Sequence, residues 1–314
     1  MVTAPFPSDW ISTWTWQGLS VGVLRAPALS PTDGDKTEPY PIVLIHGFGA
    51  CKEHWRHNVE ALRAERPVFA LDLIGFGASA KPRSQLKGEP EEAGALQYGI
   101  ELWSQQVAEF ITEEVGCPVY LIGNSIGGVV ALAAAQRLEQ THTPAQRVVL
   151  VDCAQRALDD KRLADQPPLR RWGRPLLKAL VRQRWLTSGL FKALAKPAVI
   201  RKVLLQAYPS GANVDDQLVQ LLLQPALQPG ADEAFRGFIN LFNDLIAPEL
   251  LTELKTPVSM IWGQRDPWEP VEEARRWRDF PCVEELHELP GLGHCPHDEA
   301  PDQVNPLLLQ AIRR

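Results

Sequence analysis

The stretch VYLIGNSIGGVVALAAA, residues 119–135, places several glycines around one serine, Ser125. An apolar run precedes the glycines and an alanine-rich run follows them, which predicts a strand that turns sharply into a helix. Such glycines either bring backbone amides to a phosphate or bend the chain so tightly that one side chain is exposed. The residues around GNSIG decide between these two structures.

The phosphate-binding alternatives lack the residues that they need. A P-loop carries Lys-Ser or Lys-Thr after its glycines, whereas Val129 and Val130 follow here. A dinucleotide-binding loop needs the wider spacing GxGxxG and an acidic residue about 20 positions further on. GNSIG instead fits GxSxG, a strand-to-helix turn in which bulkier residues two before or two after the serine would clash. The motif predicts that Ser125 is an exposed nucleophile at the N-terminus of a helix.

Strand-like and helix-like segments alternate on both sides of this motif. The strand-like segments are 12–26 (with a hairpin at Gln17-Gly18), 40–49, 66–77, 117–124 and 145–154, and helix-like segments lie at 55–64, 100–116 and 126–140. This alternation predicts a doubly wound, parallel sheet. After Asp152 the strand pattern stops for about a hundred residues, and it returns only at 256–268 and 283–294. We therefore expect a helical insertion above the carboxyl ends of the strands, where open α/β sheets place their sites.

Two later motifs supply partners for the serine. Asp266 follows a predicted strand in WGQRDPWEP, and His294 lies in a glycine-rich loop after the last predicted strand. A nucleophile on this kind of sheet is followed in sequence by an acid and then by a histidine. We expect His294 to accept the Ser125 proton, and Asp266 to orient the imidazole and stabilise its charge. Asp152, at the end of an earlier strand, is the alternative acid, although we expect it to cap the start of the insertion.

Acyl transfer also requires two backbone N–H donors for the negatively charged intermediate. Ile126, just after the serine, supplies one donor, and we expect Phe48 in HGFGA to supply the other. Further substrate contacts are expected from His46, Gly47, Asn124 and Trp268. We expect no cofactor, and we expect no metal because the histidines of EHWRH and HCPH lack another group at ligand spacing.

Composition limits the setting in which the protein works. The 314 residues are 45% hydrophobic, which allows a large core, and the net charge of −6 argues against a general nucleic-acid partner. Five scattered cysteines without CxxC spacing fit a reducing compartment. The first residues show no signal-peptide pattern, and no apolar run reaches the ~18 residues of a spanning helix. We expect a soluble protein, either cytoplasmic or peripheral to a membrane.

The predicted insertion carries a concentrated positive charge. Residues 156–202 contain thirteen Lys or Arg and three Asp or Glu, a local charge of +10, so the remainder carries −16. One helical face carries Leu176, Leu177 and Leu180, and the opposite face carries Lys178 and Arg182. Aromatic residues are interspersed: Trp172, Trp185 and Phe191. Such segments bind anionic membrane surfaces, but the same pattern fits a solvated lid whose leucines pack on the core. Both interpretations stay open.

The motifs together resemble the α/β-hydrolase superfamily over nearly the full length of the chain. The matching pieces are HGFGA, DLIGFGAS, GNSIGG, WGQRDPWEP and GHCPHDEAP, and the last three are similar to the pheophytinase and chlorophyll dephytylase branch of plants and cyanobacteria. The resemblance implies an α/β-hydrolase fold, an eight-stranded, mostly parallel sheet with a helical cap inserted after the sixth strand. It implies a core of residues 1–152 and 256–314 and a cap of residues 153–255.

The same resemblance implies an activity. The family's nucleophile, acid and base fall on Ser125, Asp266 and His294, and the reaction would be hydrolysis of the phytyl ester of chlorophyll or pheophytin, releasing phytol. A location in the cytoplasm or on the thylakoid membrane would follow, and the lack of a transit-peptide pattern indicates a cyanobacterial protein or a mature form.

Other functions of the same fold are alternatives. Haloalkane dehalogenases and epoxide hydrolases use an aspartate where Ser125 stands, so both classes are excluded. A carboxylesterase or lipase for another hydrophobic ester fits the same residues. A ligand-binding receptor that keeps an intact triad is a further alternative, from a different functional class.

Overall fold

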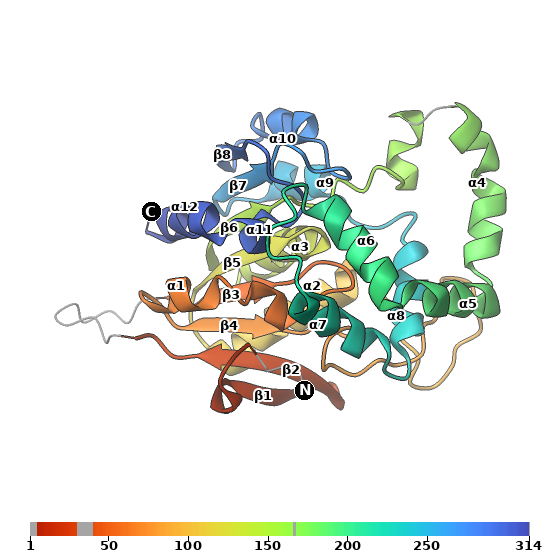
Figure 1. Cartoon of the computed structure of the whole chain (residues 1–314), viewed down its shortest axis with the longest axis horizontal. Helices are drawn as coiled ribbons and strands as arrows, with labels where there is room; N and C mark the ends of the chain where they lie inside the picture. The colour runs from red at the N-terminus through yellow and green to blue at the C-terminus, as the bar shows by residue number, and fades with distance from the viewer. Residues whose placement is uncertain (1–4, 30–39, 166–167, 314) are drawn as a thin grey trace.

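The protein is described from a computed structural model that covers residues 5–29, 40–165 and 168–313. An eight-stranded sheet forms its centre, in the order β1-β2-β4-β3-β5-β6-β7-β8 (Figure 1). The strands are β1 (Ile11–Trp16), β2 (Leu19–Ala26), β3 (Ile42–Ile45), β4 (Val68–Leu71), β5 (Val119–Asn124), β6 (Ala145–Val151), β7 (Val258–Gly263) and β8 (Val283–Leu289). The pairs β1–β2 and β2–β4 are antiparallel and all other pairs are parallel, so the predicted mostly parallel sheet is confirmed.

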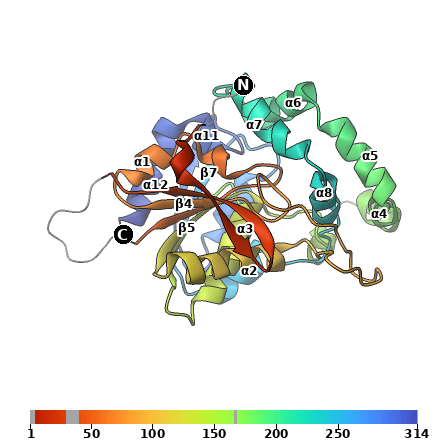
Figure 2. The same ribbon diagram turned by 90° about the horizontal axis from the view of Figure 1, so that it is seen from below.

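Helices cover both faces of this sheet, as Figure 2 shows. One face carries α2 (Ile100–Phe110), α3 (Ile126–Leu138), α9 (Ala247–Glu253) and α10 (Val271–Trp277), and the other carries α1 (Val59–Arg63) and α12 (Pro301–Ile312). Successive residues of β3 point to opposite sides, because Val43 and Ile45 join one hydrophobic cluster while Ile42 and Leu44 join the other. A strand buried on both faces needs apolar residues at every position, which explains the unbroken run IVLI.

Local predictions at the two ends of the core have different outcomes. The hairpin at Gln17-Gly18 is confirmed, because Trp16 pairs with Leu19 and both turn residues have positive φ, as a tight two-residue hairpin requires. The helix predicted over 55–64 is shorter than expected. A 3₁₀ turn, η2 (Lys52–Trp55), precedes it, and α1 itself covers only Val59–Arg63.

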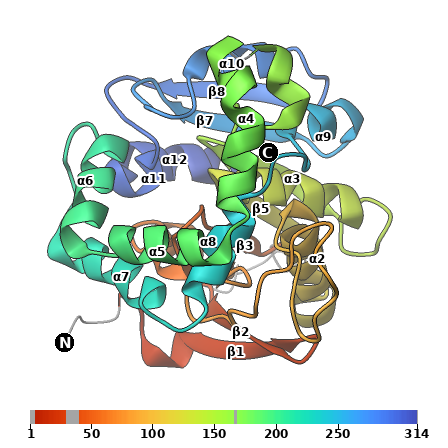
Figure 3. The ribbon, with the colours of Figure 1, turned by 90° about the vertical axis from the view of Figure 1, so that its right-hand side faces the viewer.

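The predicted helical insertion follows β6, the sixth strand. It contains α4 (Pro168–Val181), α5 (Arg184–Leu194), α6 (Pro197–Ala207), α7 (Asp216–Ala226) and α8 (Ala231–Ile239), which we call the cap and which face the viewer in Figure 3. Short helices complete the described chain: η1 (Ser8–Trp10), η3 (Ile111–Val115), η4 (Asp160–Asp165) and α11 (Pro296–Glu299). Residues Ala247 and Leu250 of α9 join the cluster that contains α3, so α9 packs with the sheet. The limits of 153 and 255 for a cap domain stay a prediction.

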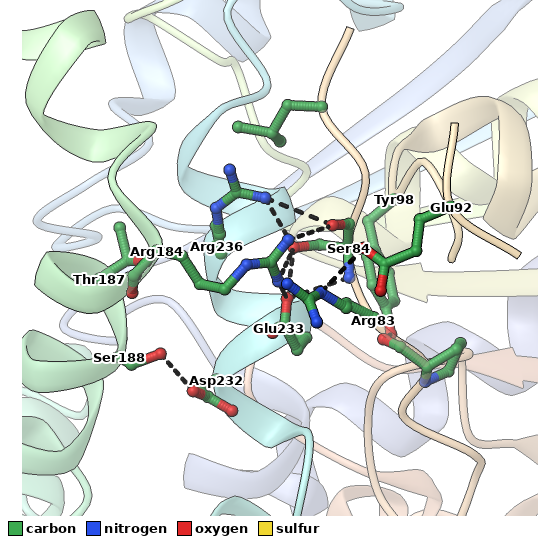
Figure 4. Close-up of polar contacts among 12 residues, drawn as sticks. Arg83, Ser84, Glu92, Tyr98, Arg184, Thr187, Ser188, Asp232, Glu233 and Arg236 are labelled. Atoms are coloured by element: carbon green, nitrogen blue, oxygen red, sulfur yellow. Dashed lines mark hydrogen bonds and ion pairs between the residues drawn. The ribbon is translucent and has the colours of Figure 1, made fainter. Parts of the chain in front are cut away.

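A polar cluster fastens the cap to the core at one side (Figure 4). The Ser84 N–H and hydroxyl donate to Glu233 of α8 at 3.0 and 2.5 Å. Arg184 of α5 donates to the Ser84 carbonyl at 2.9 Å, and Arg236 of α8 donates to the Ser84 hydroxyl at 3.1 Å. One loop residue therefore holds two cap helices. Within the described ranges, no helix is both long and apolar enough to cross a membrane.

Candidate active site

Ser125 lies in a strained turn between β5 and α3. Its φ of 55° and ψ of −125° are rare for a residue with a side chain, and such strain is typical of functional positions. A Cβ added to Gly123 would stand 2.3 Å from the Gly127 carbonyl oxygen, and one added to Gly127 would stand 2.5 Å from the carbonyl oxygens of Ile45 and His46. The glycines are therefore required by close backbone contacts, as the GxSxG interpretation predicts.

Asp266 and His294 meet at the carboxyl ends of β7 and β8. The His294 Nδ1 to Asp266 Oδ2 distance is 2.7 Å, and the Asp266 side chain is fully buried. The other carboxylate oxygen accepts the backbone N–H groups of Trp268 and Glu269 at 2.8 and 3.1 Å. These donors fix the carboxylate, which in turn orients the imidazole. The Trp268 ring packs edge-on against His294 at 4.8 Å between centroids.

Asn124 connects the serine turn to the histidine loop. Its side-chain amide donates to the carbonyl oxygens of Val151 and His294, at 3.1 and 3.0 Å. The residue before the nucleophile thereby holds the backbone of the predicted base. Among the described residues, no hydrogen bond joins the Ser125 hydroxyl to His294. Such bonds are often long in ligand-free enzymes and shorten when substrate binds.

The two predicted oxyanion donors flank the serine. A Cβ added to Gly47 would lie 3.1 Å from the Ser125 Cβ, so the HGFGA loop runs directly beside the nucleophile. In the described part of the chain, the backbone N–H groups of Phe48 and Ile126 donate to no protein acceptor. Two such amides on either side of a nucleophile can bind an oxyanion. The Phe48 ring stacks on Phe238 of α8 with centroids 3.8 Å apart, which ties this loop to the cap.

His46 has a different position from the one expected of a substrate-binding residue. Its ring is buried, and both of its nitrogens are used by the backbone. Nε2 accepts the Leu73 N–H at 3.0 Å, so the proton lies on Nδ1, which donates to the Gly47 carbonyl at 2.8 Å. Burial lowers the pKa of His46 and keeps the ring neutral. The ring of His46 therefore holds the HGFGA loop, and the buried side chain of Asn124 likewise bonds only to backbone, at Val151 and His294.

An apolar cavity of about 70 Å³ opens beside the HGFGA loop. Aromatic side chains from the loop, the core and the cap form much of its wall: Phe48, Phe76, Phe191 and Phe235. The rings of Phe48 and Phe76 pack edge-on at 5.6 Å between centroids. A site so lined suits a hydrophobic part of a ligand.

Two further acids, the buried Asp152 and the partly buried Glu269, lie next to the Asp266–His294 pair. Asp152 does not cap a helix as predicted, because its Oδ1 accepts the Gly263 N–H at 2.9 Å inside the sheet. Burial raises the pKa of Asp152 well above its usual range, and the charge of Asp266 adds to this effect. Burial also raises the pKa of Glu269 to about 7. Sequence reasoning missed Glu269, although it stands in the DPWEP motif three residues after the predicted acid.

Two of the histidines that raised the question of a metal, His54 and His297, are packed in the core, whereas His57 is partly exposed. His54 and His297 are buried with ring centroids 4.8 Å apart, and His54 Nε2 lies 2.8 Å from the Tyr208 hydroxyl. Burial lowers the pKa of His54 to about 4. Among the described residues, no group of three or more His, Cys, Asp or Glu has an arrangement that could hold a metal ion.

Curated relatives cover most of this chain at low identity. Pheophytinase from Arabidopsis thaliana chloroplasts is 26% identical over 87% of this chain and 61% of its own length. The acetyltransferase component of a Pseudomonas putida acetoin-cleaving system is 28% identical over 87% and 64%. The chain thus spans less than two thirds of the length of these two relatives. A Pseudomonas putida 2-hydroxy-6-oxo-2,4-heptadienoate hydrolase is 24% identical over 81% of this chain and 82% of its own.

Solved structures and a family model agree on the fold. The epoxide hydrolase CorEH has a TM-score of 0.74 at 19% identity, and a serine hydrolase of carbazole degradation has 0.71 at 18%; each comparison covers 96% of this chain and 98% of the other. A model described as the alpha/beta hydrolase family matches residues 42–307. That range runs from β3 into α12 and includes every predicted triad residue. The chain therefore belongs to the alpha/beta hydrolase family.

Proposed function

We propose that this hydrolase-family protein is a serine-dependent carboxylic ester hydrolase that works through an acyl-enzyme. The 2.7 Å bond between Asp266 and His294, beside the strained turn of Ser125, is the observation that carries the proposal. His294 removes the Ser125 proton as the hydroxyl attacks the ester carbonyl, and Asp266 stabilises the imidazolium. His294 then returns that proton to the leaving alcohol.

The second half of the reaction repeats these roles with water as the nucleophile. His294 accepts a proton from the attacking water and returns it to Ser125 as the acid product leaves. The oxyanion of each tetrahedral intermediate accepts hydrogen bonds from the Phe48 and Ile126 amides. Because the Phe48 ring stacks on α8, the position of this amide depends on the cap as well as the core.

For the substrate we propose the phytyl ester of chlorophyll or pheophytin. Support comes from the likeness to Arabidopsis pheophytinase and from the aromatic wall beside the HGFGA loop. Purified protein is expected to convert chlorophyll a or pheophytin a to the dephytylated pigment and phytol, followed by chromatography. Ser125→Ala should lose this activity while its circular dichroism spectrum stays that of the wild type.

A carboxylesterase for smaller esters is the second candidate. The apolar cavity beside the HGFGA loop supports it, because its aromatic wall suits the short apolar part of a simple ester. Rates on p-nitrophenyl esters and on pigment separate the two candidates. Cleavage of the simple esters with both pigments untouched would refute the phytyl substrate and keep the mechanism. A single turnover with tightly retained product would instead favour a receptor.

We also propose that the cap contacts an anionic membrane surface. Its leucines do not pack on the core, since Leu176, Leu177 and Leu180 of α4 are all exposed, Leu176 by 66%. Two basic side chains here are engaged by the protein: Lys178 of α4 pairs with Asp160, and Arg182, which follows α4, donates to the Lys87 carbonyl. Trp172 lies outside the residues whose side chains are described.

Lysines on α5 and α6 provide the positive charge for this contact. Lys192 and Lys202 are exposed, and no ion pair involves either within the described chain. Exposed apolar side chains surround them on the same two helices: Trp185, Leu190, Leu194, Val203 and Leu205. Apolar groups flanked by lysines are the combination that binds anionic lipid.

Sedimentation with liposomes tests the membrane contact. The protein should bind phosphatidylserine-containing vesicles at low salt, and less as salt rises. The double variant Lys192→Glu/Lys202→Glu should lose binding, whereas Arg276→Glu/Arg278→Glu, with the same change in net charge on α10 and its end, should keep it. Equal loss in both variants would mean that only total charge matters, and no binding at low salt would refute the contact.

A further inference from the structure

Asp152 occupies a constrained, fully buried position behind the triad. It follows β6 with a φ of 43°, and its backbone N–H donates to the Ile261 carbonyl at 3.0 Å. Its Oδ1 accepts the Gly263 N–H at 2.9 Å, while its Oδ2 is buried without a protein donor. A carboxylate oxygen left in this state is costly, whereas a protonated one can donate a hydrogen bond.

The acceptor for such a proton is the Asp266 carboxylate. Asp152 and Asp266 are both bonded to Gly263: Asp152 accepts the Gly263 N–H, and the Gly263 carbonyl accepts the Asp266 N–H at 3.2 Å. The negative charge of Asp266 raises the pKa of Asp152, because two carboxyl groups that lie so close do not both ionise at neutral pH. Asp266 accepts three N–H donors, from Trp268, Glu269 and His294, and these stabilise its charged form. Asp152 accepts only one.

The Arg162 guanidinium pairs with Glu273 at 3.1 Å and acts on Glu269, whereas the charges that act on Asp152 are the negative ones of Asp266 and Glu269. Glu269 is an acid that accepts the Gln155 N–H at 2.8 Å. Cys153 is a buried thiol whose pKa is raised by burial. His294 is bonded to Asp266 and not to Asp152. The proton shared by the two aspartates therefore belongs on Asp152.

We propose that Asp152 is a neutral carboxylic acid whose Oδ2 hydrogen is donated to Asp266, so that it positions the triad acid against His294. The triad thereby continues to a fourth residue on the neighbouring strand. Asp152 touches neither substrate nor nucleophile, and it acts through Asp266. This role rests on the proposed ester hydrolase.

Asparagine and alanine at position 152 separate this role from its alternatives. Asn keeps an acceptor for Gly263 and a donor for Asp266, so Asp152→Asn should keep kcat/KM within about threefold of wild type, with the acid limb of its pH profile unmoved. Asp152→Ala removes a hydrogen bond to a charged group, so kcat should fall about 10- to 100-fold with KM unchanged. The acid limb of the Asp152→Ala pH profile should move to higher pH. Without the hydrogen bond from Asp152, the Asp266 carboxylate stabilises the His294 imidazolium more strongly.

Two results would overturn the proposal. If Asp152 is charged, Asp152→Asn removes that charge and moves the acid limb to lower pH by about one unit or more. If Asp152→Ala keeps the wild-type kcat, Asp152 positions nothing. The pH profile of Glu269→Gln is measured in parallel. An acid limb that is caused by titration of Glu269 would disappear in that variant alone.

Infrared spectroscopy tests the proton without any activity. Glu269, with a pKa of about 7, has a carboxyl band of its own at neutral pH, so the comparison is made where Glu269 is replaced. Glu269→Gln should show the carbonyl-stretch band of a protonated carboxyl group at neutral pH, and the double variant Glu269→Gln/Asp152→Asn should lack it. Absence of this band from Glu269→Gln would refute a neutral Asp152 even if Asp152→Ala does not fold. If the wild type hydrolyses no ester but Glu269→Gln shows the band, the proposed function fails and the protonation state stands.

Discussion

Replacing Gly127 by alanine tests the backbone contact on which the serine turn depends. The new Cβ would stand 2.5 Å from the carbonyl oxygens of Ile45 and His46, about 0.9 Å inside ordinary van der Waals contact at 3.4 Å. Both obstacles are backbone atoms, so β3 or α3 must move. We expect a loss of about 1–3 kcal/mol in the free energy of unfolding, although alanine is the better helix former.

The same shift should disable the site, because His46 begins the loop that carries Phe48. A displacement of about 1 Å at a catalytic group costs on the order of 100-fold in rate, so kcat/KM on a p-nitrophenyl ester should fall by about that factor. Gly189→Ala is the matched control: a Cβ there meets nothing within 4 Å, and α5 should gain about 0.5–1 kcal/mol. Urea unfolding measures both variants. Wild-type stability and rate in Gly127→Ala would refute the contact.

Two further predictions concern buried charge. Asp72→Asn removes the buried carboxylate that lies 2.8 Å from the Lys52 ammonium and leaves Glu53, at 2.7 Å, as its remaining charged partner, so it should cost about 1–3 kcal/mol by urea unfolding; no measurable loss would contradict this. The pKa of His54 is about 4 in the folded protein and about 6.5 in the unfolded chain, so the unfolded chain binds more protons between these two pH values. The free energy of unfolding should therefore fall by up to about 3 kcal/mol as the pH drops from 6.5 to 4. His54→Gln should reduce this slope and the exposed His142→Gln should not.

Much of the fold follows from the sequence because its signals are local. An unbroken apolar run such as IVLI marks a strand buried on both faces, and glycines at the carboxyl end of a strand mark the turn that carries a functional residue. The order Ser125, Asp266, His294 then selects the family. Shorter elements escape this reasoning, and α1 is an example, because a single helical turn depends on tertiary contacts more than on periodicity.

The roles of the residues around the triad depend on contacts that sequence distance hides. His46 stands in a motif beside the nucleophile, yet both ring nitrogens bind backbone groups. Asp152 was expected at a helix start, but β6 and β7 are adjacent and direct its carboxylate to Gly263. Asp152 follows β6, Asp266 follows β7 and His294 follows β8, so the strand order β6-β7-β8 places Asp266 next to His294. Sequence narrowed the choice of acid to two aspartates and could not reveal that both are bonded to Gly263.

The backbone of His294 is bonded to the cap itself. Its N–H donates to the Ala207 carbonyl at the end of α6, and Glu299 accepts from Ser210 of the cap and from Gly293 of the histidine loop, each at 2.8 Å. A chimera that exchanges this cap for that of a relative would therefore remove part of the support of the general base. Exchange of the cap alone would not transfer substrate preference to this protein. The 293–299 loop must be exchanged together with the cap.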